Sequence, residues 1–378
     1  MYYFDYASTC PINKKIFNLC SQELENGIFN NPSSTHEEGI KAADFLQKAR
    51  QIIADILKCS ITEIIFTSGG SESDNMALKG IMLKYKPTEA ELITSTIEHP
   101  AILQTCKQLE RFGYKIHYIK PNNMGYISAD DIKNKINNKT KLISIMTINN
   151  ELGTKQNIYE IAHIAHTKGV LFHTDAVQAL GKIDLDLSNI DMASFAGHKI
   201  GAMKGVGFLY IKDYVELEPL ICGGGQESDL RAGTENVFGN YMMALCLKEY
   251  YKEWNDCNIK IMNYLQDKIV KSLKEEFGNN IIINSNQLSI LNIAFKNINS
   301  ETLQLMLSSK GDMVSVASAC HSNVQEPSYV LKEIGLSPEF QNGSLRISIS
   351  PSTKEFEVDN LIKNIIFYAN HLFKIGKE

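Results

Sequence analysis

Two neighbouring stretches decide the fold, Val170-Leu-Phe-His-Thr-Asp175 and Asp191-Met-Ala-Ser-Phe-Ala-Gly-His-Lys199. Each contains an apolar run of strand length; the first run ends in an acid and the second in His-Lys. A lysine amine can form a Schiff base with the aldehyde of pyridoxal phosphate (PLP), and a carboxylate can keep the pyridine nitrogen protonated so that the ring accepts electrons. Either residue alone would more often be a solvated surface residue. The surrounding segments must therefore decide whether Asp175 and Lys199 share a PLP site.

Strand-like runs alternate with helix-length amphipathic runs through most of the first 250 residues. The runs expected to form strands are Ile64–Thr67, Glu91–Ser95, Lys115–Ile119, Lys141–Met146, Val170–His173, Met192–Phe195 and Gly205–Ile211. This alternation predicts an α/β fold, with a mostly parallel sheet covered on both faces and ligands at the carboxyl ends of its strands. The polar residues that directly follow such runs, and that we expect to meet at this edge, are Ser71, His99, Asn150, Asp175 and Lys199.

The rest of the chain has a different pattern. Residues 241–277 are typical of a long helical connector, and the last hundred residues mix the strand-like runs Leu291–Phe295 and Leu345–Ile349 with helices. A chain of 378 residues is too long for one ordinary core. We therefore expect a large α/β domain followed by a smaller α+β domain.

Composition excludes several classes of partner. The net charge is −5 and no dense Lys/Arg block occurs, so direct binding to nucleic acid is not expected. No stretch of about 18 apolar residues is present and the N-terminus lacks signal-peptide features, so we expect no membrane association. The eight cysteines are scattered without a C-x-x-C pair, which predicts reduced thiols in a cytoplasmic protein.

Three segments offer chemistry, and each has a plainer interpretation. Gly69-Gly70-Ser71 joins a strand to a helix and can cradle a phosphate at the helix N-terminus, although Ser71 or Ser73 could simply cap that helix. His99 ends a strand beside a proline and could move protons near neutral pH, or merely pack. Cys320 could be a nucleophilic thiol, although most free cysteines are buried packing residues.

Together these segments resemble the cysteine desulfurases of the NifS/IscS type, within the class V aminotransferase branch of fold-type I PLP enzymes. The resemblance runs from Tyr3 to Arg346. The motifs that carry it are Tyr3-Phe-Asp-Tyr-Ala, Asn31-Pro-Ser-Ser-x-His36, Thr67-Ser-Gly-Gly-Ser-Glu-Ser-Asp-Asn75, Glu98-His99, Asn149-Asn-Glu-Leu-Gly153, Asp175-Ala-x-Gln178, Gly197-His-Lys199, Arg231-Ala-Gly-Thr-Glu-Asn236, Ser318-Ala-Cys320 and Glu326-Pro-Ser-Tyr-Val330.

The resemblance implies a homodimeric L-cysteine desulfurase with PLP as its cofactor and no metal. Lys199 would be bonded to PLP and act as acid and base. Asp175 would contact the pyridine nitrogen, Gln178 would contact the phenolic oxygen, and His99 would stack on the ring. The phosphate would be held by Gly70, Ser71, His198 and the other subunit's Thr234. Asn150 and Arg346 would bind the substrate carboxylate, because an arginine fork suits two oxygens. Cys320 would take the sulfur as a persulfide, leaving alanine, and the loop that follows resembles the family group in which it carries sulfur to acceptor proteins.

The resemblance also implies the domain limits. We expect a large PLP-binding domain at 16–250 with a seven-stranded sheet, and a smaller domain formed by 1–15 and 251–378 that carries the cysteine loop. Ala196 stands where the family usually has a phosphate-binding serine, and His321 follows Cys320 where threonine is common, so we expect His321 to favour the thiolate. The alternative activity is that of a selenocysteine lyase or another class V β-lyase, which would not depend on Cys320.

Overall fold

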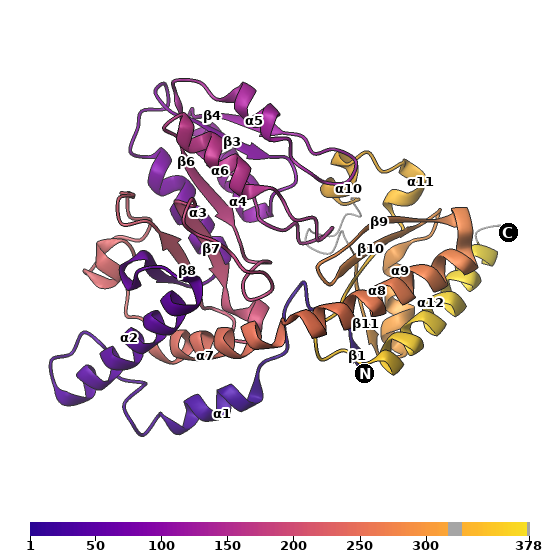
Figure 1. Ribbon diagram of the computed structural model, residues 1–378, viewed down its shortest axis with the longest axis horizontal. Coiled ribbons are helices and arrows are strands. Elements are labelled where there is room, and N and C mark those ends of the chain that lie inside the picture. The colour runs from indigo at the N-terminus through magenta and orange to yellow at the C-terminus, as the bar shows by residue number, and fades with distance from the viewer. Residues whose placement is uncertain (317–326, 376–378) are drawn as a thin grey trace.

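A seven-stranded sheet forms the centre of the larger part of the computed structural model (Figure 1), which describes residues 1–316 and 327–375. Its strands lie in the order β2 (Ile64–Thr67), β8 (Gly207–Ile211), β7 (Met192–Ala196), β6 (Leu171–Asp175), β5 (Thr140–Ser144), β3 (Glu91–Ser95) and β4 (Lys115–Ile119). Of these seven, β8 alone runs antiparallel to the other six. The prediction of an α/β fold with a mostly parallel seven-stranded sheet is confirmed.

Helices cover both faces of this sheet because its strands are apolar on both sides. Within β2, Ile65 packs against α3 and α4, whereas Ile64 and Phe66 face the opposite core that includes α2, α6 and α7. The bounds of the helices in this part are α1 (Lys14–Gln22), α2 (Glu37–Leu57), α3 (Gly70–Met82), α4 (Pro100–Arg111), α5 (Ala129–Lys135), α6 (Ile158–Thr167) and α7 (Val237–Glu253). The α3 helix begins at Gly70, within the Gly69-Gly70-Ser71 segment that was expected to join a strand to a helix.

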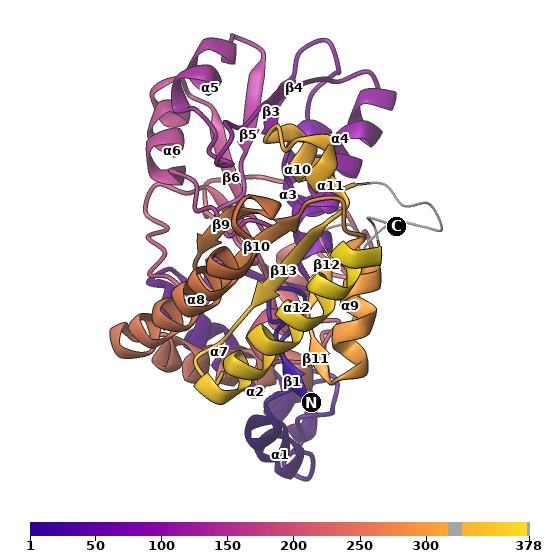
Figure 2. The same cartoon turned by 90° about the vertical axis from the view of Figure 1, so that its right-hand side faces the viewer.

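The C-terminal part contains a second, antiparallel sheet of four strands. Their order is β12 (Ser315–Val316), β13 (Ser344–Ser348), β10 (Ile290–Phe295) and β9 (Ile281–Gln287). The helices of this part are α8 (Asp256–Phe277), α9 (Ser300–Ser309), α10 (Tyr329–Glu333), α11 (Pro338–Gln341) and α12 (Glu355–Ile375). Figure 2 shows α9 and α12 side by side, and the two helices are in contact.

The predicted helical stretch 241–277 is divided between two helices. The α7 helix ends at Glu253, and α8 begins after Asn255, whose side chain accepts a hydrogen bond from the Asn258 N–H at 3.0 Å. A side-chain cap of this kind satisfies a backbone donor of a new helix, so the chain starts a second helix here.

The N-terminus joins the C-terminal part. The strand β1 (Tyr2–Tyr3) pairs in parallel with β11 (Asp312–Met313). Directly after it, the Phe4 carbonyl accepts a hydrogen bond from the Ser348 N–H at 2.8 Å, and the Ala7 N–H donates to Ser348 Oγ at 2.9 Å. These contacts fix the segment that crosses to the large sheet, while the division of the chain at residues 16 and 251 stays a prediction.

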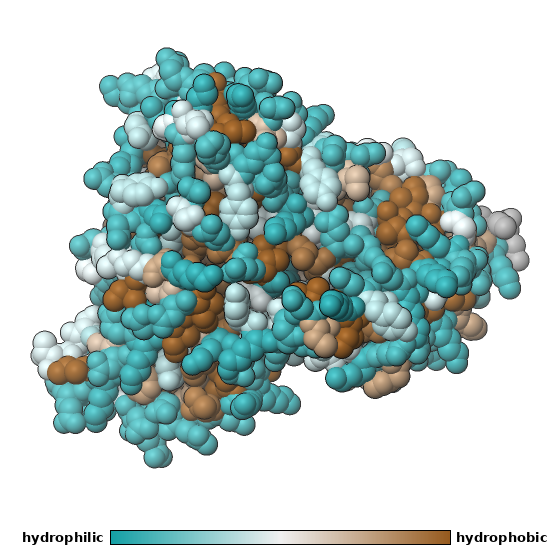
Figure 3. All heavy atoms as spheres, viewed as in Figure 1, coloured by the Kyte–Doolittle hydropathy of each residue, from teal (hydrophilic) through white to brown (hydrophobic). Residues whose placement is uncertain are grey.

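In the described ranges, no helix is both long enough and apolar enough to cross a bilayer. On the face shown in Figure 3, hydrophilic residues cover most of the surface and apolar residues form separate patches between them.

Candidate active site

The lysine at the end of β7 is held by a tight turn. Lys199 lies on the short 3-10 helix η2 (Gly197–Ile200), which follows β7 without a connecting loop. The turn ends at Gly201 in the left-handed region with φ +81°, and a Cβ there would lie 3.2 Å from the Pro11 carbonyl oxygen. Glycine is suited to this conformation, so the turn fixes the direction in which the preceding lysine leaves the sheet.

The Lys199 amine is held by backbone oxygens. Its Nζ donates to the Ala7 carbonyl at 2.7 Å and to the Ser8 carbonyl at 2.8 Å. Burial first, and then the nearby cations of Arg346 and Lys182, lower the pKa of Lys199 to about 7. An amine with this pKa is partly unprotonated near neutral pH, which is the form that attacks an aldehyde.

A buried acid and a histidine lie near this lysine. Asp175 is the last residue of β6, and its Oδ1 accepts a hydrogen bond from the Val177 N–H at 2.9 Å. His99 caps α4, because its Nδ1 accepts from the Ala101 N–H at 3.1 Å. Burial raises the pKa of Asp175, while His99 and Lys199 oppose this shift. The structure therefore brings together Asp175, His99 and Lys199, as the carboxyl ends of neighbouring strands predict.

A second buried acid, Asp74, was missed by the sequence analysis. Single side-chain atoms of Asp74, Asp175 and His99 all lie within 4.8 Å of one another. Asp74 is 1% exposed, and its Oδ1 has no hydrogen-bond partner among the described residues. His173 Nε2 lies 3.8 Å away, but burial lowers the pKa of His173 to about 3, so its ring is neutral. Burial and the nearby Asp175 raise its pKa well above the usual value. We infer that Asp74 holds a proton and that Asp175 is the ionised acid.

The sequence contained a signal for this residue. On α3, Asp74 shares a helix face with the buried residues Ala77, Leu78 and Ile81, at spacings of three, four and seven. An acid on the apolar face of a helix is buried with it. Asp74 lies in a run of polar residues, Ser71 to Asn75, so the sequence analysis did not separate it from its solvent-facing neighbours.

The N-terminus of α3 has no side-chain cap. Its N-cap residue is Gly69 with φ +148°, and no side chain accepts from the first-turn N–H groups there. The alternative that Ser71 or Ser73 simply caps this helix is therefore wrong. A Cβ at Gly70 would lie 2.6 Å from Val177 Cγ2, so this position needs glycine. An uncapped helix of 13 residues offers free N–H groups to an anion.

His198 and Gln178 contact the N-terminal segment of the chain, whose carbonyls also hold the Lys199 amine. His198 Nδ1 lies 3.2 Å from Thr9 Oγ1, and burial lowers the pKa of His198 to about 4, so its imidazole is neutral at physiological pH. The Gln178 Nε2 donates to the Ala7 carbonyl at 2.8 Å. That oxygen also accepts from Lys199, so Gln178 and Lys199 flank one carbonyl.

Arg346 lies on β13 of the second sheet, and its side chain reaches the N-terminal segment that holds Lys199. Its guanidinium donates to the Asn150 carbonyl at 2.9 Å, to Asp5 Oδ1 at 2.9 Å and to Ser8 Oγ at 2.5 Å. Among the described residues, Arg346 Nε and Asn150 Oδ1 are buried without a partner. The side chains predicted to bind the substrate carboxylate are thus adjacent, and each keeps one unused polar atom.

Two predicted residues are not brought to this site by the described structure. Thr234 is exposed and lines a separate hollow together with Ser68 and Asn240. Cys320 and the neighbouring His321 lie outside the described residues.

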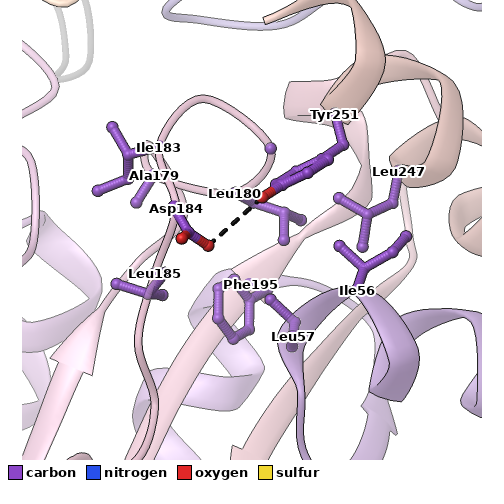
Figure 4. A pocket seen from close by; sticks show the side chains of 11 residues that line it. Ile56, Leu57, Ala179, Leu180, Ile183, Asp184, Leu185, Phe195, Leu247 and Tyr251 are labelled. Atoms are coloured by element: carbon purple, nitrogen blue, oxygen red, sulfur yellow. Dashed lines mark hydrogen bonds between the residues drawn. The ribbon is translucent and has the colours of Figure 1, made fainter. Parts of the chain in front are cut away.

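A small cavity elsewhere is too small for a cofactor. It is lined by apolar side chains such as Phe195 and Leu247, and its rim carries a hydrogen bond of 3.3 Å from the Tyr251 hydroxyl to Asp184 (Figure 4). Its volume of about 10 Å³ holds at most one water. This cavity therefore offers no room for a cofactor.

Comparisons with known proteins agree over nearly the whole chain. The family model described as "Aminotransferase class-V" matches residues 2–361. A cysteine desulfurase IscS from Histophilus somni (strain 2336) is 38% identical over 375 residues, which cover 96% of this chain and 92% of the relative. A cysteine desulfurase IscS from Methanosarcina thermophila is 38% identical over 365 residues, covering 96% and 90%.

Solved structures show the same similarity. A NifS-like protein superposes with a TM-score of 0.91 at 34% identity, covering 98% of this chain and all of the other. A structure described as SspA in complex with cysteine superposes with a TM-score of 0.82 at 35% identity, covering 94% of this chain and all of the other. The chain therefore belongs to the class V aminotransferase family, whose members are PLP-dependent.

Proposed function

We propose that the protein is a PLP-dependent L-cysteine desulfurase. The observation that carries this proposal is the Lys199 amine, which is fixed by two backbone carbonyls and has a pKa of about 7 close to the buried acid Asp175. The relatives named cysteine desulfurase cover more than nine-tenths of the chain. These two facts support the same chemistry.

The residues present fit PLP. The uncapped start of α3 at Gly70 and Ser71 suits its phosphate, with His198 and, in a homodimer, Thr234 from the second copy. Asp175 would hold a proton between its carboxylate and the pyridine nitrogen, since its raised pKa favours sharing that proton. When bound, PLP supplies an electron sink for bonds broken beside the substrate's α-carbon.

The other polar side chains around Lys199 have complementary tasks. Gln178 would donate its remaining amide hydrogen to the phenolic oxygen of the cofactor, and His99 would contact the ring. The pKa of His99 is lowered by burial, so its imidazole is neutral. Its Nδ1 accepts from the Ala101 N–H, so the proton lies on Nε2, where it can be donated and taken back. Lys199 would bond to the cofactor and, once released by substrate, move a proton at the α-carbon.

The substrate carboxylate would be bound by Arg346 and Asn150. Both have a buried polar atom without a partner in the described ranges, and such atoms are costly unless a ligand satisfies them. A similar protein, SspA, has been solved in complex with cysteine. L-cysteine is therefore the amino acid that we assign.

Cys320 would act as the sulfur acceptor. In the overall reaction, L-cysteine and the Cys320 thiol give L-alanine and a Cys320 persulfide: the carbon–sulfur bond breaks, a sulfur–sulfur bond forms, and the substrate carbon gains hydrogen. A further acceptor protein would then take the sulfur. The seven described cysteines are all free thiols, which supports a reducing, cytoplasmic location.

The test is the release of alanine and sulfide from L-cysteine by the wild type and by Cys320→Ala, with Cys257→Ala as a control that also removes an exposed thiol. We expect equal amounts of alanine and sulfur from the wild type and from Cys257→Ala. Cys320→Ala should keep the cofactor absorbance but form no alanine. Alanine formation that persists in Cys320→Ala would instead identify a lyase that needs no persulfide.

A further inference from the structure

A buried lysine, Lys182, has no task in the scheme above. It lies in the turn after β6, its residue is 5% exposed, and among the described residues its ammonium forms no ion pair with a carboxylate. Burial lowers its pKa to about 8. Lysines are almost never buried unless they are paired, so a reason for this one is needed.

The ammonium has two contacts. Its Nζ donates to Gln178 Oε1 at 3.1 Å, and it lies 5.7 Å from the centroid of the Trp254 ring, within cation–π distance. Gln178 is itself 4% exposed. The contacts of Lys182 are thus made by one side chain of the active site and one aromatic ring of the core.

The contacts of Gln178 with Lys182 and with the Ala7 carbonyl together fix how its amide is oriented. A carboxamide can usually be turned by 180° with little cost, but an ammonium is only a donor, so the amide oxygen must face Lys182. The Gln178 NH₂ group is consequently directed to the Ala7 carbonyl at 2.8 Å, the same oxygen that accepts from Lys199. One of its two hydrogens is then free for a ligand oxygen.

The charge of Lys182 acts on the same site. Apart from burial, the cations of Arg346 and Lys182 lower the pKa of Lys199. Cys10 and Asp175 raise it. The groups that face Lys182 itself are Cys10 and Arg346. A buried cation disfavours a second cation nearby, because the interior screens charge poorly.

We propose that Lys182 is a positioning residue of this active site, whose ammonium orients the Gln178 amide and favours the neutral form of the Lys199 nitrogen. The inference deepens the proposed function and rests on it, because both effects concern the cofactor that Lys199 would hold. It gives Lys182 two separable effects, one on orientation and one on charge.

The charge effect is tested by titrating the absorbance of the bound cofactor between about pH 5 and about pH 10. Lys182→Met and the shorter Lys182→Leu remove the ammonium, Lys182→Arg retains a cation, and Lys271→Met removes an exposed lysine of α8. The pH at the midpoint of this titration should rise by at least about 0.5 in the neutral variants Lys182→Met and Lys182→Leu, because a nearby cation is lost. It should stay unchanged in Lys182→Arg and Lys271→Met. An unchanged midpoint in a folded neutral variant overturns the charge effect.

The orientation effect is tested by the affinity of the apoprotein for PLP. Lys182→Met should weaken binding by about five-fold, the value of one hydrogen bond, and Gln178→Ala should weaken it similarly. Once the charge effect on Lys199 is corrected for from the titration, the double variant should bind no more weakly than Gln178→Ala alone, because Lys182 acts on the orientation through Gln178. Additive losses would contradict this. A wild-type protein that develops no cofactor absorbance would refute the proposed function itself, which is a separate outcome.

Discussion

Two buried aspartates, one directly before β7 and one at the end of the neighbouring β6, show how the two ends of one sheet differ. Asp191 precedes β7, at the amino ends of the parallel strands. Its Oδ2 accepts from the Phe172 N–H at 2.6 Å and lies 2.8 Å from His166 Nε2, while its Oδ1 accepts from the Tyr214 hydroxyl. Both oxygens of this acid are therefore satisfied within the protein.

Asp175 ends β6, at the opposite end of the sheet. Among the described residues, the Val177 N–H is the one hydrogen-bond donor to its carboxylate, and burial raises its pKa. Buried polar groups are nearly always satisfied, so an acid left with so few partners indicates a place for a ligand. We therefore assign Asp191, whose oxygens are both satisfied, to the stability of the fold, and Asp175, which has unused hydrogen-bonding capacity, to the chemistry.

The largest expected effect is on Lys199, which shares the functional end of the sheet with Asp175. Lys199→Ala should lose at least about 10³-fold in alanine formation from L-cysteine, because the covalent partner of the cofactor is removed. Lys204→Ala removes an exposed lysine five residues later and should stay near the wild-type rate. Equal losses in the two variants would show that the turn, and not the amine, matters.

Asp175→Asn tests the comparison itself. We expect alanine formation to fall by roughly 10²-fold, since a neutral amide cannot hold the pyridine nitrogen protonated. The melting temperature of the apoprotein should not fall, because the substitution removes a charge whose burial is unfavourable. Activity and thermal unfolding measured on one preparation decide the point, and a variant that loses stability while keeping activity would reverse the assignment.

This contrast explains what the sequence could and could not predict. Asp175 and Lys199 end apolar runs, so their place at the carboxyl ends of strands followed from pattern alone. The backbone carbonyls of Ala7 and Ser8 carry no side-chain signature, and their contact with Lys199 arises only when the N-terminal segment crosses between the two sheets. Lys182 was not singled out, because its burial depends on how the turn after β6 packs against the core.

The pKa of Lys199 makes PLP binding depend on pH. A pKa of about 7 means that the amine is mostly protonated below that pH and mostly neutral above it. The initial rate at which apoprotein gains the cofactor absorbance should therefore rise about ten-fold from about pH 6 to about pH 8. An ordinary exposed lysine would still gain in rate well above pH 9, so a rise that continues there would contradict the low pKa.

Arg346→Lys tests the contribution of the second sheet. A lysine keeps the positive charge but cannot bind Asp5, Ser8 and a substrate carboxylate with one planar fork. We expect KM for L-cysteine to rise about ten-fold, the loss of one charge-assisted hydrogen bond, with a smaller change in kcat. A changed kcat with an unchanged KM would assign Arg346 to the fold of the N-terminal segment instead of to substrate binding.

The smallest effect on activity is expected at the amino end of the sheet. Asp191→Asn places an amide NH₂ where a carboxylate oxygen now accepts from the Phe172 N–H and His166, or from the Tyr214 hydroxyl. The Tyr214 hydroxyl can accept from this NH₂, but the Phe172 N–H then keeps a neutral amide oxygen in place of a carboxylate oxygen, and the weaker hydrogen bond costs about 1 kcal/mol in the free energy of unfolding. Urea unfolding should show this loss, while alanine formation per folded molecule stays within about two-fold of the wild type because Asp191 has no unused atom for a ligand. A loss of activity comparable to that of Asp175→Asn would mean that the two ends of the sheet are not functionally separate.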